Sequence, residues 1–530
     1  MDAVKKLLEA GDAILGIELG STRIKAVVVD DAHRVIATGG YDWENRLEDG
    51  IWTYSLQDVE RGLQEAYADL TKQIREAYGV TVTRFSAIGV SGMMHGYLPF
   101  DKEMRQLAAF RTWRNTTARE AAEQLTSVFQ YNIPDRWCVA HLYDMILRGE
   151  AHVREIDFLT TLAGYIHFRL TGERVLGIGD ASGMMAVDTA RCDYDEARIT
   201  QFEELIADRH YPWTLRGILP RVLRAGDPAG ELTKEGAAWL DVSGSLEPGI
   251  PLCPPEGDTA TGMVATNAVA RGTGNLSAGT SGFLMLVMEE QIKSLHRELE
   301  PIATPDSYPV AMVHANNCTT DINAWVSLFK EFAELCGRTL STDELYGTLY
   351  RKALEGEADA GGSYAFNYHA GEGIAHLDEG RPMFVRMPQA TFDLASFMRA
   401  QLYGTMTLIR MGVDLLRAEG GTLSMIVGHG GLFKTEGVAQ KFLADALKTP
   451  VAVMQTAGEG GAFGIAVLAS YMVNRAQDEA LPVFLNERVY ADAAMKVMEP
   501  DEEGMDGFDR YLEGYKHALN AERAAVEAMR

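Results

Sequence analysis

The chain has 530 residues, more than a single hydrophobic core usually serves, so we expect at least two domains. Apolar residues make up 47% of the chain and charged residues 23%, which is typical of a globular protein. The formal net charge of −26 argues against nucleic acid or an anionic membrane surface as the main partner, because both attract an excess of Lys and Arg.

Neither targeting nor disulfide patterns stand out in the sequence. Residues 1–13 lack the apolar core and cleavage site of a secretory signal, and no run of about eighteen apolar residues occurs. We therefore expect a cytoplasmic protein. The five cysteines are scattered without a CxxC pair, which predicts reduced, mostly buried thiols rather than structural disulfides or a zinc site.

The first half of the chain predicts three strands, a helix and another strand. Residues 16–30 form two short apolar strands around a polar corner, and residues 34–43 continue as a third strand. From residue 55 to residue 78, apolar side chains recur every three or four positions, which predicts an amphipathic helix capped by Ser55. Residues 85–92 predict a buried strand that ends in glycine.

The second half repeats this order. Residues 271–289 predict a second hairpin and residues 307–315 a third strand. Further along, we expect helices and strands in the segments 392–416, 423–431, 436–448, 450–455 and 460–473.

Strands that alternate with helices indicate an α/β fold, here duplicated, with a mixed sheet flanked by helices in each half and a cleft between the halves. Pro and Gly punctuate residues 255–272, so we place domains at 1–265 and 266–490 and a helical tail at 491–530. The acidic stretch 501–509 predicts a solvated turn.

Two hairpin corners share an unusual composition. One is Gly20-Ser21-Thr22, and the other is Gly279-Thr280-Ser281-Gly282. Glycine allows a close backbone approach, and neighbouring N–H and hydroxyl groups can donate to phosphate oxygens. One such corner is an ordinary hairpin feature, but two at equivalent points of a duplicated fold favour a nucleotide site.

The stretch GHGGLFKT (428–435) is neither a P-loop nor a dinucleotide fingerprint. Phe433 stands where a P-loop requires the glycine before its lysine. The glycines predict a strand-to-helix turn, which is either purely structural or shaped to let a flat ligand lie close.

Two acids lie where catalysis could use them. Asp258 precedes a helix-like run, so it is either an ordinary helix cap or a general base that takes a proton from a substrate hydroxyl. Glu18 lies just before the first corner, where a magnesium ion could need a carboxylate.

Taken in order, these segments resemble the FGGY carbohydrate kinases, which share the actin/hexokinase/Hsp70 (ribonuclease H-like) fold. The resemblance covers most of the chain and is carried by residues 16–30, 90–101, 169–188, 256–264, 277–282, 367–378, 428–447 and 458–469.

This resemblance implies ATP-dependent phosphorylation of a sugar hydroxyl with Mg²⁺, most similar to that by xylulose kinases. Asp258 is then the catalytic base, and Glu18 and Asp258 serve the metal. The implied sugar-binding residues are Met94, His95, Trp113, Arg114 and Asp258. The implied ATP-binding residues are Gly20, Ser21, Thr22, Gly279, Thr280, Ser281, Gly430, Gly431 and Lys434. The family includes monomers and dimers, and we expect a homodimer.

Three positions depart from the family pattern. Glu18 replaces the usual aspartate, and the segment around Trp113 and Arg114 lacks the acid and the downstream arginine found in relatives. Asn316 and Asn317 also differ from the xylulose kinase pattern and are either pocket amides or turn residues.

Other functions compete with a xylulose kinase. One is a kinase for another ketose or polyol, such as L-ribulose, erythritol or glycerol. Another is a non-catalytic regulator that binds ATP or sugar on the same fold, although it would have no need of Asp258 as a base. A protein-directed ATPase of the Hsp70 or actin type would require a peptide-binding or polymer-forming appendage, for which the sequence gives no sign.

Overall fold

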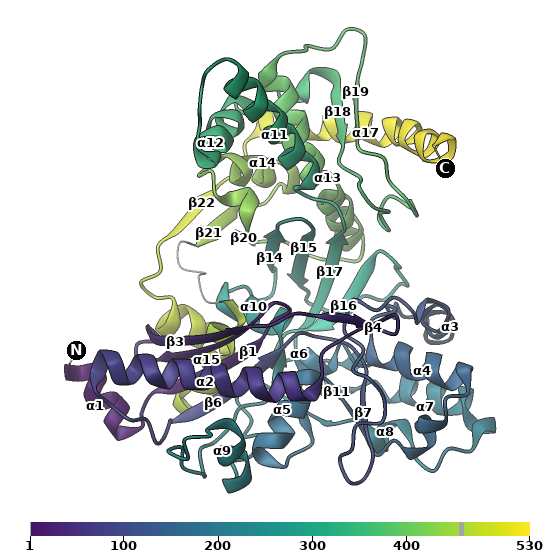
Figure 1. Ribbon diagram of the computed structural model, residues 1–530. Helices are drawn as coiled ribbons and strands as arrows, with labels where there is room; N and C mark the ends of the chain where they lie inside the picture. Colours follow the sequence, from purple (N-terminus) through teal and green to yellow (C-terminus); the bar gives the residue numbers. More distant parts are fainter. Residues whose placement is uncertain (1, 455–459, 530) are drawn as a thin grey trace. The chain divides into compact units, whose positions relative to one another are not determined.

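The computed structural model describes residues 2–454 and 460–529, which divide into two compact units (Figure 1). Unit 1 comprises residues 1–269, 301–310 and 457–492. Unit 2 comprises residues 270–300, 311–456 and 493–530. Each unit is thus assembled from separate stretches of the chain, whereas the sequence analysis drew contiguous boundaries.

The main sheet of unit 1 has five strands in the order β13-β6-β1-β2-β3. Strands β1 and β2 form an antiparallel hairpin, and β6 runs parallel to β1 on its other side. The bounds are β1 Ile14–Leu19, β2 Arg23–Val29, β3 Val35–Asp42, β6 Ala87–Gly92 and β13 Glu256–Gly257. The strands predicted at residues 16–43 and 85–92 are therefore present.

Two helices pack closely on this sheet from distant parts of the sequence. Helix α2 (Leu56–Tyr78) lies on β2 and β3, and its predicted cap is present because Ser55 Oγ accepts the N–H of Asp58 at 3.0 Å. Helix α15 (Gly460–Asn474) lies on β1 and β6. There the chains approach so closely that a Cβ on Gly16 would lie 2.2 Å from the Ala462 carbonyl oxygen. Only glycine fits at that point of β1.

The remaining elements of unit 1 are short strands and helices. The strands are β4 Arg46–Glu48, β5 Ile51–Thr53, β7 Leu98–Phe100, β8 Phe158–Thr160, β9 Val175–Gly177, β10 Val187–Asp188, β11 Asp193–Tyr194 and β12 Arg221–Leu223. The helices are α1 Asp2–Ala10, α3 Arg119–Phe129, α4 Cys138–Arg148, α5 Leu162–Thr171, α6 Ile178–Ala181, α7 Glu196–Leu205, α8 Leu215–Ile218, α9 Lys234–Leu240, α10 Asp258–Ala265 and α16 Leu481–Phe484.

The second large sheet has seven strands in the order β16-β17-β15-β14-β20-β21-β22, of which β14, β15, β20, β21 and β22 lie wholly in unit 2. The hairpin β14–β15 is antiparallel and β20 runs parallel to β14, which is the same local arrangement as β1, β2 and β6 in unit 1. The bounds are β14 Thr273–Ala278, β15 Gly282–Val287, β16 Leu299–Ala303, β17 Pro309–Ala315, β20 Met425–His429, β21 Val451–Met454 and β22 Met495–Met498. A separate ribbon pairs β18 Ser363–Phe366 with β19 Met383–Arg386.

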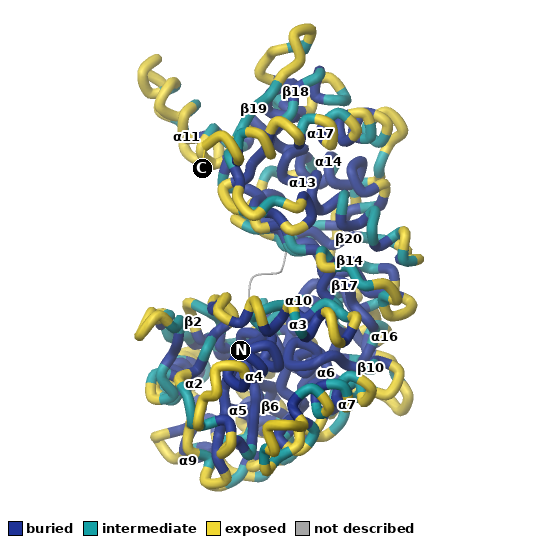
Figure 2. Tube along the Cα trace, turned by 90° about the vertical axis from the view of Figure 1, so that its right-hand side faces the viewer, coloured by how far each residue is buried: buried dark blue, intermediate teal, exposed yellow. Residues whose placement is uncertain are grey.

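The helices of unit 2 surround a long buried helix. Helix α13 (Leu394–Ala418) is buried along most of its length, whereas the second half of α11 is exposed (Figure 2). The other helices are α11 Thr320–Leu335, α12 Thr342–Ala353, α14 Val438–Leu447 and α17 Glu502–Ala528. Segments 392–416 and 436–448 are helical as predicted.

The solvated turn predicted for residues 501–509 is wrong. Asp501 caps helix α17 by accepting the N–H of Gly504 at 2.8 Å, and Phe508 is fully buried in the core of unit 2. Acidic residues near a helix N-terminus complement its dipole, so the run of acids that suggested a turn begins a helix instead.

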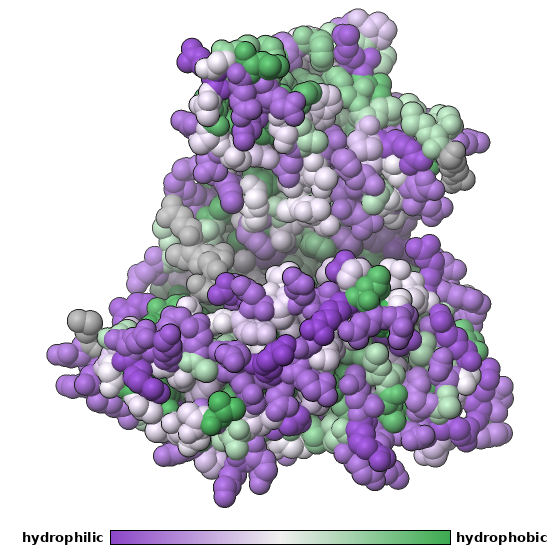
Figure 3. All heavy atoms as spheres, viewed as in Figure 1, coloured by the Kyte–Doolittle hydropathy of each residue, from purple (hydrophilic) through white to green (hydrophobic). Residues whose placement is uncertain are grey.

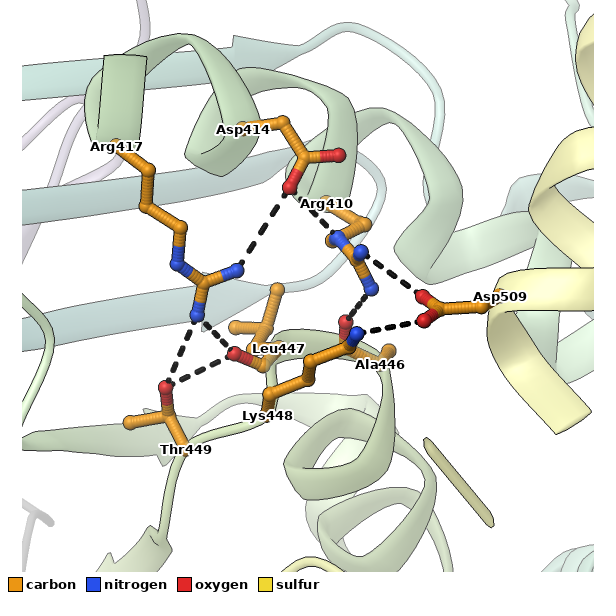
Figure 4. A network of polar contacts seen from close by, with 8 residues as sticks. All are labelled: Arg410, Asp414, Arg417, Ala446, Leu447, Lys448, Thr449 and Asp509. Carbon is orange, nitrogen blue, oxygen red and sulfur yellow. Dashed lines mark hydrogen bonds and ion pairs between the residues drawn. The ribbon is translucent and has the colours of Figure 1, made fainter. Parts of the chain in front are cut away.

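A polar network fixes the start of α17 to the rest of unit 2 (Figure 4). Asp509 accepts hydrogen bonds from Arg410 at 2.9 Å and Lys448 at 2.6 Å. Arg410, which lies on α13, also donates to the carbonyl of Ala446 at 2.6 Å, near the C-terminal end of α14. One arginine thus ties three helices together.

One face of the molecule is mainly polar, and the cysteines form no disulfide. The face in Figure 3 is covered mainly by hydrophilic residues. All five cysteines are unpaired, and Cys138, Cys253 and Cys318 are buried. Among residues 2–454 and 460–529, no helix combines the length and apolar character needed to cross a membrane.

Candidate active site

The first corner lies between β1 and β2 and is held by its carbonyl groups. The indole of Trp43 donates to the Gly20 carbonyl at 2.7 Å, and the Tyr54 hydroxyl donates to the Ser21 carbonyl at 2.5 Å. Within the described residues, the backbone N–H groups of Ser21 and Thr22 donate to no other group. The corner is therefore anchored through its acceptors and keeps donors for an anion.

Trp113 is close to this corner, and Arg114 is turned to another partner. The indole N–H of Trp113 donates to Ser21 Oγ at 3.3 Å, and 41% of the Trp113 side chain is exposed. The guanidinium of Arg114 stacks over Trp52, with 3.7 Å between its central carbon and the ring centroid. A ring that is half open to solvent beside the corner could pack against a sugar.

Two carboxylates of unit 1 lie beyond the corner, near enough for the charge of Asp258 to raise the pKa of Glu18. Asp258 is the first residue of α10, and its Oδ1 accepts the backbone N–H of Met94 at 3.2 Å. Glu18 Oε2 accepts the backbone N–H of Ala462, in the first turn of α15, at 3.2 Å. Burial and the charge of Asp258 raise the pKa of Glu18 to about 7, and burial raises the pKa of Asp258.

This pair suits a divalent cation that also binds phosphate. Two carboxylates at close range repel each other, and a cation between them relieves that repulsion. In the described part of the chain, no group of three or more His, Cys, Asp or Glu side chains could hold a metal by itself. Mg²⁺ usually takes only one or two carboxylates and fills its other positions with water and substrate phosphates, so the residues fit.

The glycine in the first turn of α15 has a role that the sequence did not reveal. Residues 458–469 were part of the resemblance to the kinase family, and Gly458 lies outside the described residues. A Cβ on Gly461 would lie 2.3 Å from Glu18 Oε1, so a larger residue at this position would have to displace that carboxylate. Gly461 therefore belongs with Glu18 in unit 1. Glutamate, one methylene longer than aspartate, reaches the helix N-terminus.

Met94 and His95 lie just after β6, and the Met94 N–H donates to Asp258 at the start of α10. His95 has a left-handed backbone with φ +73°, which is uncommon for a residue other than glycine. Burial holds the pKa of His95 well below its usual range, so the ring is neutral. Its Nδ1 lies 3.3 Å from the Gly183 carbonyl and is the donor there, because a carbonyl oxygen only accepts.

The second corner, between β14 and β15, is also anchored through its carbonyls. Thr319 Oγ1 donates to the Gly279 carbonyl at 2.7 Å, and the N–H of Cys318 donates to the Thr280 carbonyl at 2.8 Å. The backbone N–H groups of Thr280 and Ser281 donate to no other group among the described residues. Both corners thus present free donors in the same way.

A cavity of about 600 Å³ opens in unit 2 beside this corner. It is lined by Thr319, Asn323, Thr342, Asp343, Tyr346, Tyr350, Gly431, Lys434 and Thr435. The glycine turn that borders it approaches the second corner closely, because a Cβ on Gly430 would lie 2.4 Å from the Ala278 carbonyl oxygen. The volume is within the usual range for a small-molecule site.

Asn316 and Asn317, which the sequence left open between pocket and turn, hold a loop. The Asn317 amide group donates to Glu372 Oε1 at 2.7 Å and to the Ala370 carbonyl at 3.0 Å. Asn316 donates to the Gly371 carbonyl at 2.7 Å. Both side-chain amides therefore form hydrogen bonds with residues 370–372, as expected for residues that stabilise a turn.

The fully buried carboxyl of Glu372 predicts a pH-dependent stability. Burial raises its pKa from 4.5 to about 7, so the folded state binds the proton more tightly than the unfolded state. Its contribution of about 3 kcal/mol is present below pH 4.5 and is lost as the pH rises to 7. In urea unfolding at pH 5 and pH 8, Glu372→Gln should show a smaller loss of unfolding free energy than the wild type. An identical loss in both proteins would contradict this.

The predicted residues thus fall into two groups. Unit 1 brings together Glu18, Met94, His95 and Asp258, with Gly20, Ser21, Thr22 and Trp113 at the first corner. Unit 2 brings together Gly279, Thr280 and Ser281 with Gly430, Gly431 and Lys434. Arg114 is the predicted residue that packs elsewhere, on Trp52.

Known proteins share both the sequence pattern and the fold. Residues 13–265 match the N-terminal domain, and residues 274–473 the C-terminal domain, of the FGGY family of carbohydrate kinases. A xylulose kinase of Haemophilus influenzae is 22% identical over 86% of this chain and 90% of its own length. A xylulose kinase of Escherichia coli is 26% identical over 52% of this chain and 54% of its own.

The solved structure of ligand-bound xylulose kinase from Lactobacillus acidophilus aligns with a TM-score of 0.78, over 98% of this chain and all of that one, at 17% identity. This likeness shows the fold, and the two family domains together cover most of the chain. The chain therefore belongs to the FGGY family of carbohydrate kinases, and it is a sugar kinase of mixed α/β, actin-like fold.

Proposed function

We propose that this kinase transfers the γ-phosphate of ATP to a hydroxyl of a pentulose such as xylulose, with Asp258 as the general base. The observation that carries the proposal is the meeting of Asp258 with the Met94–His95 segment, where Asp258 Oδ1 accepts the Met94 N–H. A carboxylate fixed in this way can take the proton of a hydroxyl that the neutral His95 ring orients.

The two units divide the substrates between them. Unit 1 holds the sugar with Met94, His95 and Trp113 and supplies the base. Unit 2 holds ATP in the cavity beside Lys434 and Gly431, with its phosphates on the Gly279–Ser281 corner. Phosphoryl transfer depends chiefly on positioning and charge neutralisation, so a base, a sugar site and a phosphate-binding corner are the groups that the reaction needs from the protein.

Glu18 and Asp258 would hold Mg²⁺, which supplies charge neutralisation on the phosphates. The carboxylate of Glu18 already accepts the N–H of Ala462, and its remaining lone pairs would be available to hold the ion directly or through a water. Asp258 keeps its second oxygen for the substrate proton.

A substrate panel tests the proposal. ADP release is followed with D-xylulose, L-xylulose, D-ribulose, L-ribulose, erythritol and glycerol, and we expect the highest kcat/KM for a pentulose. EDTA should abolish the activity and added Mg²⁺ should restore it. A preference for glycerol or erythritol would reassign the substrate to polyols. No activity on any of them would overturn the proposal and favour a sugar- or ATP-binding regulator.

A further inference from the structure

The carboxylate of Glu256 is buried in unit 1, two residues before Asp258. It is 1% exposed and lies in the short strand β13, which pairs with the end of β6. Its two oxygens accept backbone N–H groups from α6, that of Gly179 at 3.3 Å and that of Asp180 at 2.8 Å. A buried acid is costly, so its place at this junction needs a reason.

The chain around this carboxylate is shaped to admit it. A Cβ on Gly177 would lie 2.1 Å from Glu256 Oε1, and a Cβ on Gly179 would lie 2.5 Å from Oε2. The N–H of Gly177 also donates to the Pro255 carbonyl at 2.8 Å. The segment before α6 is therefore bonded both to the backbone next to Glu256 and to its side chain. The start of α6 is therefore built against Glu256 rather than merely near it.

The turn that Glu256 holds continues directly to the candidate sugar site. The Gly183 carbonyl, just after α6, is the group to which His95 Nδ1 donates. In the same turn, Asp180 accepts the hydroxyl of Thr161 at 2.6 Å through one oxygen. Its other oxygen has no partner among the described residues and would lie 3.2 Å from a Cβ on Gly257, the residue between Glu256 and Asp258.

We propose that Glu256 is a positioning residue. It fixes the α6 turn to β13 and so holds the side chains of His95 and Asp258 at the relative positions that sugar phosphorylation requires. The inference rests on the roles proposed above for those two residues. Through β13, Glu256 sets where α10 begins, and through α6 and Gly183 it sets the ring of His95. The sugar hydroxyl needs both groups at the same time.

Glu256→Gln separates this role from simple packing. Glutamine keeps the size of the side chain but has one acceptor oxygen, and its NH₂ group would face a backbone N–H donor. A displacement of about 1 Å at reacting groups can cost about 100-fold in rate. We expect kcat with D-xylulose to fall about 100-fold and KM for D-xylulose to rise about 10-fold, with KM for ATP unchanged because ATP lies in unit 2.

Asp241→Asn is the matched control. Asp241 is also buried in unit 1 and accepts three backbone N–H groups, from Ser243, Ser245 and Leu246, in the turn after α9. None of these partners belongs to the candidate site. We expect Asp241→Asn to lower the melting temperature while kcat and both KM values remain at the wild-type level.

Gly179→Ala is a second variant, because it keeps the carboxyl group of Glu256 but pushes a methyl group against its Oε2 at 2.5 Å and against the Cβ of Ala260 in α10 at 2.6 Å. It should reproduce the split between the KM for D-xylulose and the KM for ATP. Wild-type KM for D-xylulose and wild-type kcat in a folded Glu256→Gln or Gly179→Ala protein would overturn the inference. If Asp258→Asn is fully active, the proposed role of Asp258 as the base is wrong, and the positioning role that rests on it falls with it. If Asp258→Asn is inactive while both variants behave as wild type, only the positioning role fails.

Discussion

Asp258→Asn should abolish sugar phosphorylation and leave nucleotide binding intact. Asparagine can still accept the Met94 N–H through its oxygen, so the start of α10 is kept, but it cannot take a proton from the sugar hydroxyl. General-base catalysis contributes about 10²- to 10⁴-fold, and we expect kcat to fall by at least the lower of these factors. ADP release with D-xylulose measures the rate, and calorimetry with ATP measures nucleotide binding.

Asp195→Asn is the control for this substitution. Asp195 caps α7 in unit 1 by accepting the N–H of Arg198 at 3.1 Å, and asparagine caps helices equally well. The control should keep the wild-type rate. If Asp258→Asn retains more than a tenth of the wild-type kcat, Asp258 is a helix-start residue and not the base.

Gly430→Ala should weaken ATP use about 100-fold, measured as KM for ATP. The backbone of Gly430 has φ +101°, and its Cβ position lies 2.4 Å from the carbonyl oxygen of Ala278, the residue before the second corner. Both partners are backbone, so neither can swing away. The methyl group must displace the glycine turn, the corner or both, while KM for the sugar remains unchanged because unit 1 is untouched.

Gly420→Ala separates the clash from the backbone conformation. Gly420 also lies in unit 2 with a positive φ of +86°, but its Cβ would meet nothing within 4 Å. We expect it to cost about 1 kcal/mol of stability without changing KM for ATP. Wild-type KM for ATP in Gly430→Ala would remove the turn from the nucleotide site.

The parts of the fold that follow from local physics were predictable. The corners at residues 20–22 and 279–281, the Ser55 cap and the face of α2 depend on turn chemistry and apolar spacing within one short segment. The same holds for the resemblance to the kinase family, because its motifs are contiguous. Residues 501–509 misled the prediction, since acids that solvate a turn also stabilise the start of a helix.

The remaining features depend on partners far away in the sequence. The sequence around Glu256 contains no signal that its side chain accepts the backbone N–H groups of residues 179 and 180. In the same way, Gly461 could not be assigned to Glu18 without the packing of α15 on β1. Asn317 was ambiguous because an amide in a pocket and an amide in a turn look alike until Glu372 is seen beside it.

The return of residues 457–492 to unit 1 sets the order in which the protein can be completed on the ribosome. Strands β1 and β6 leave the ribosome early, but α15, which covers them, emerges only after most of unit 2 has been made. Until then, the apolar side chains that pack against α15 lack this helix as cover. Such contacts between distant segments slow folding and expose surface that sticks to other chains. This kinase should therefore depend on chaperones during synthesis more than a protein of the same size with contiguous domains.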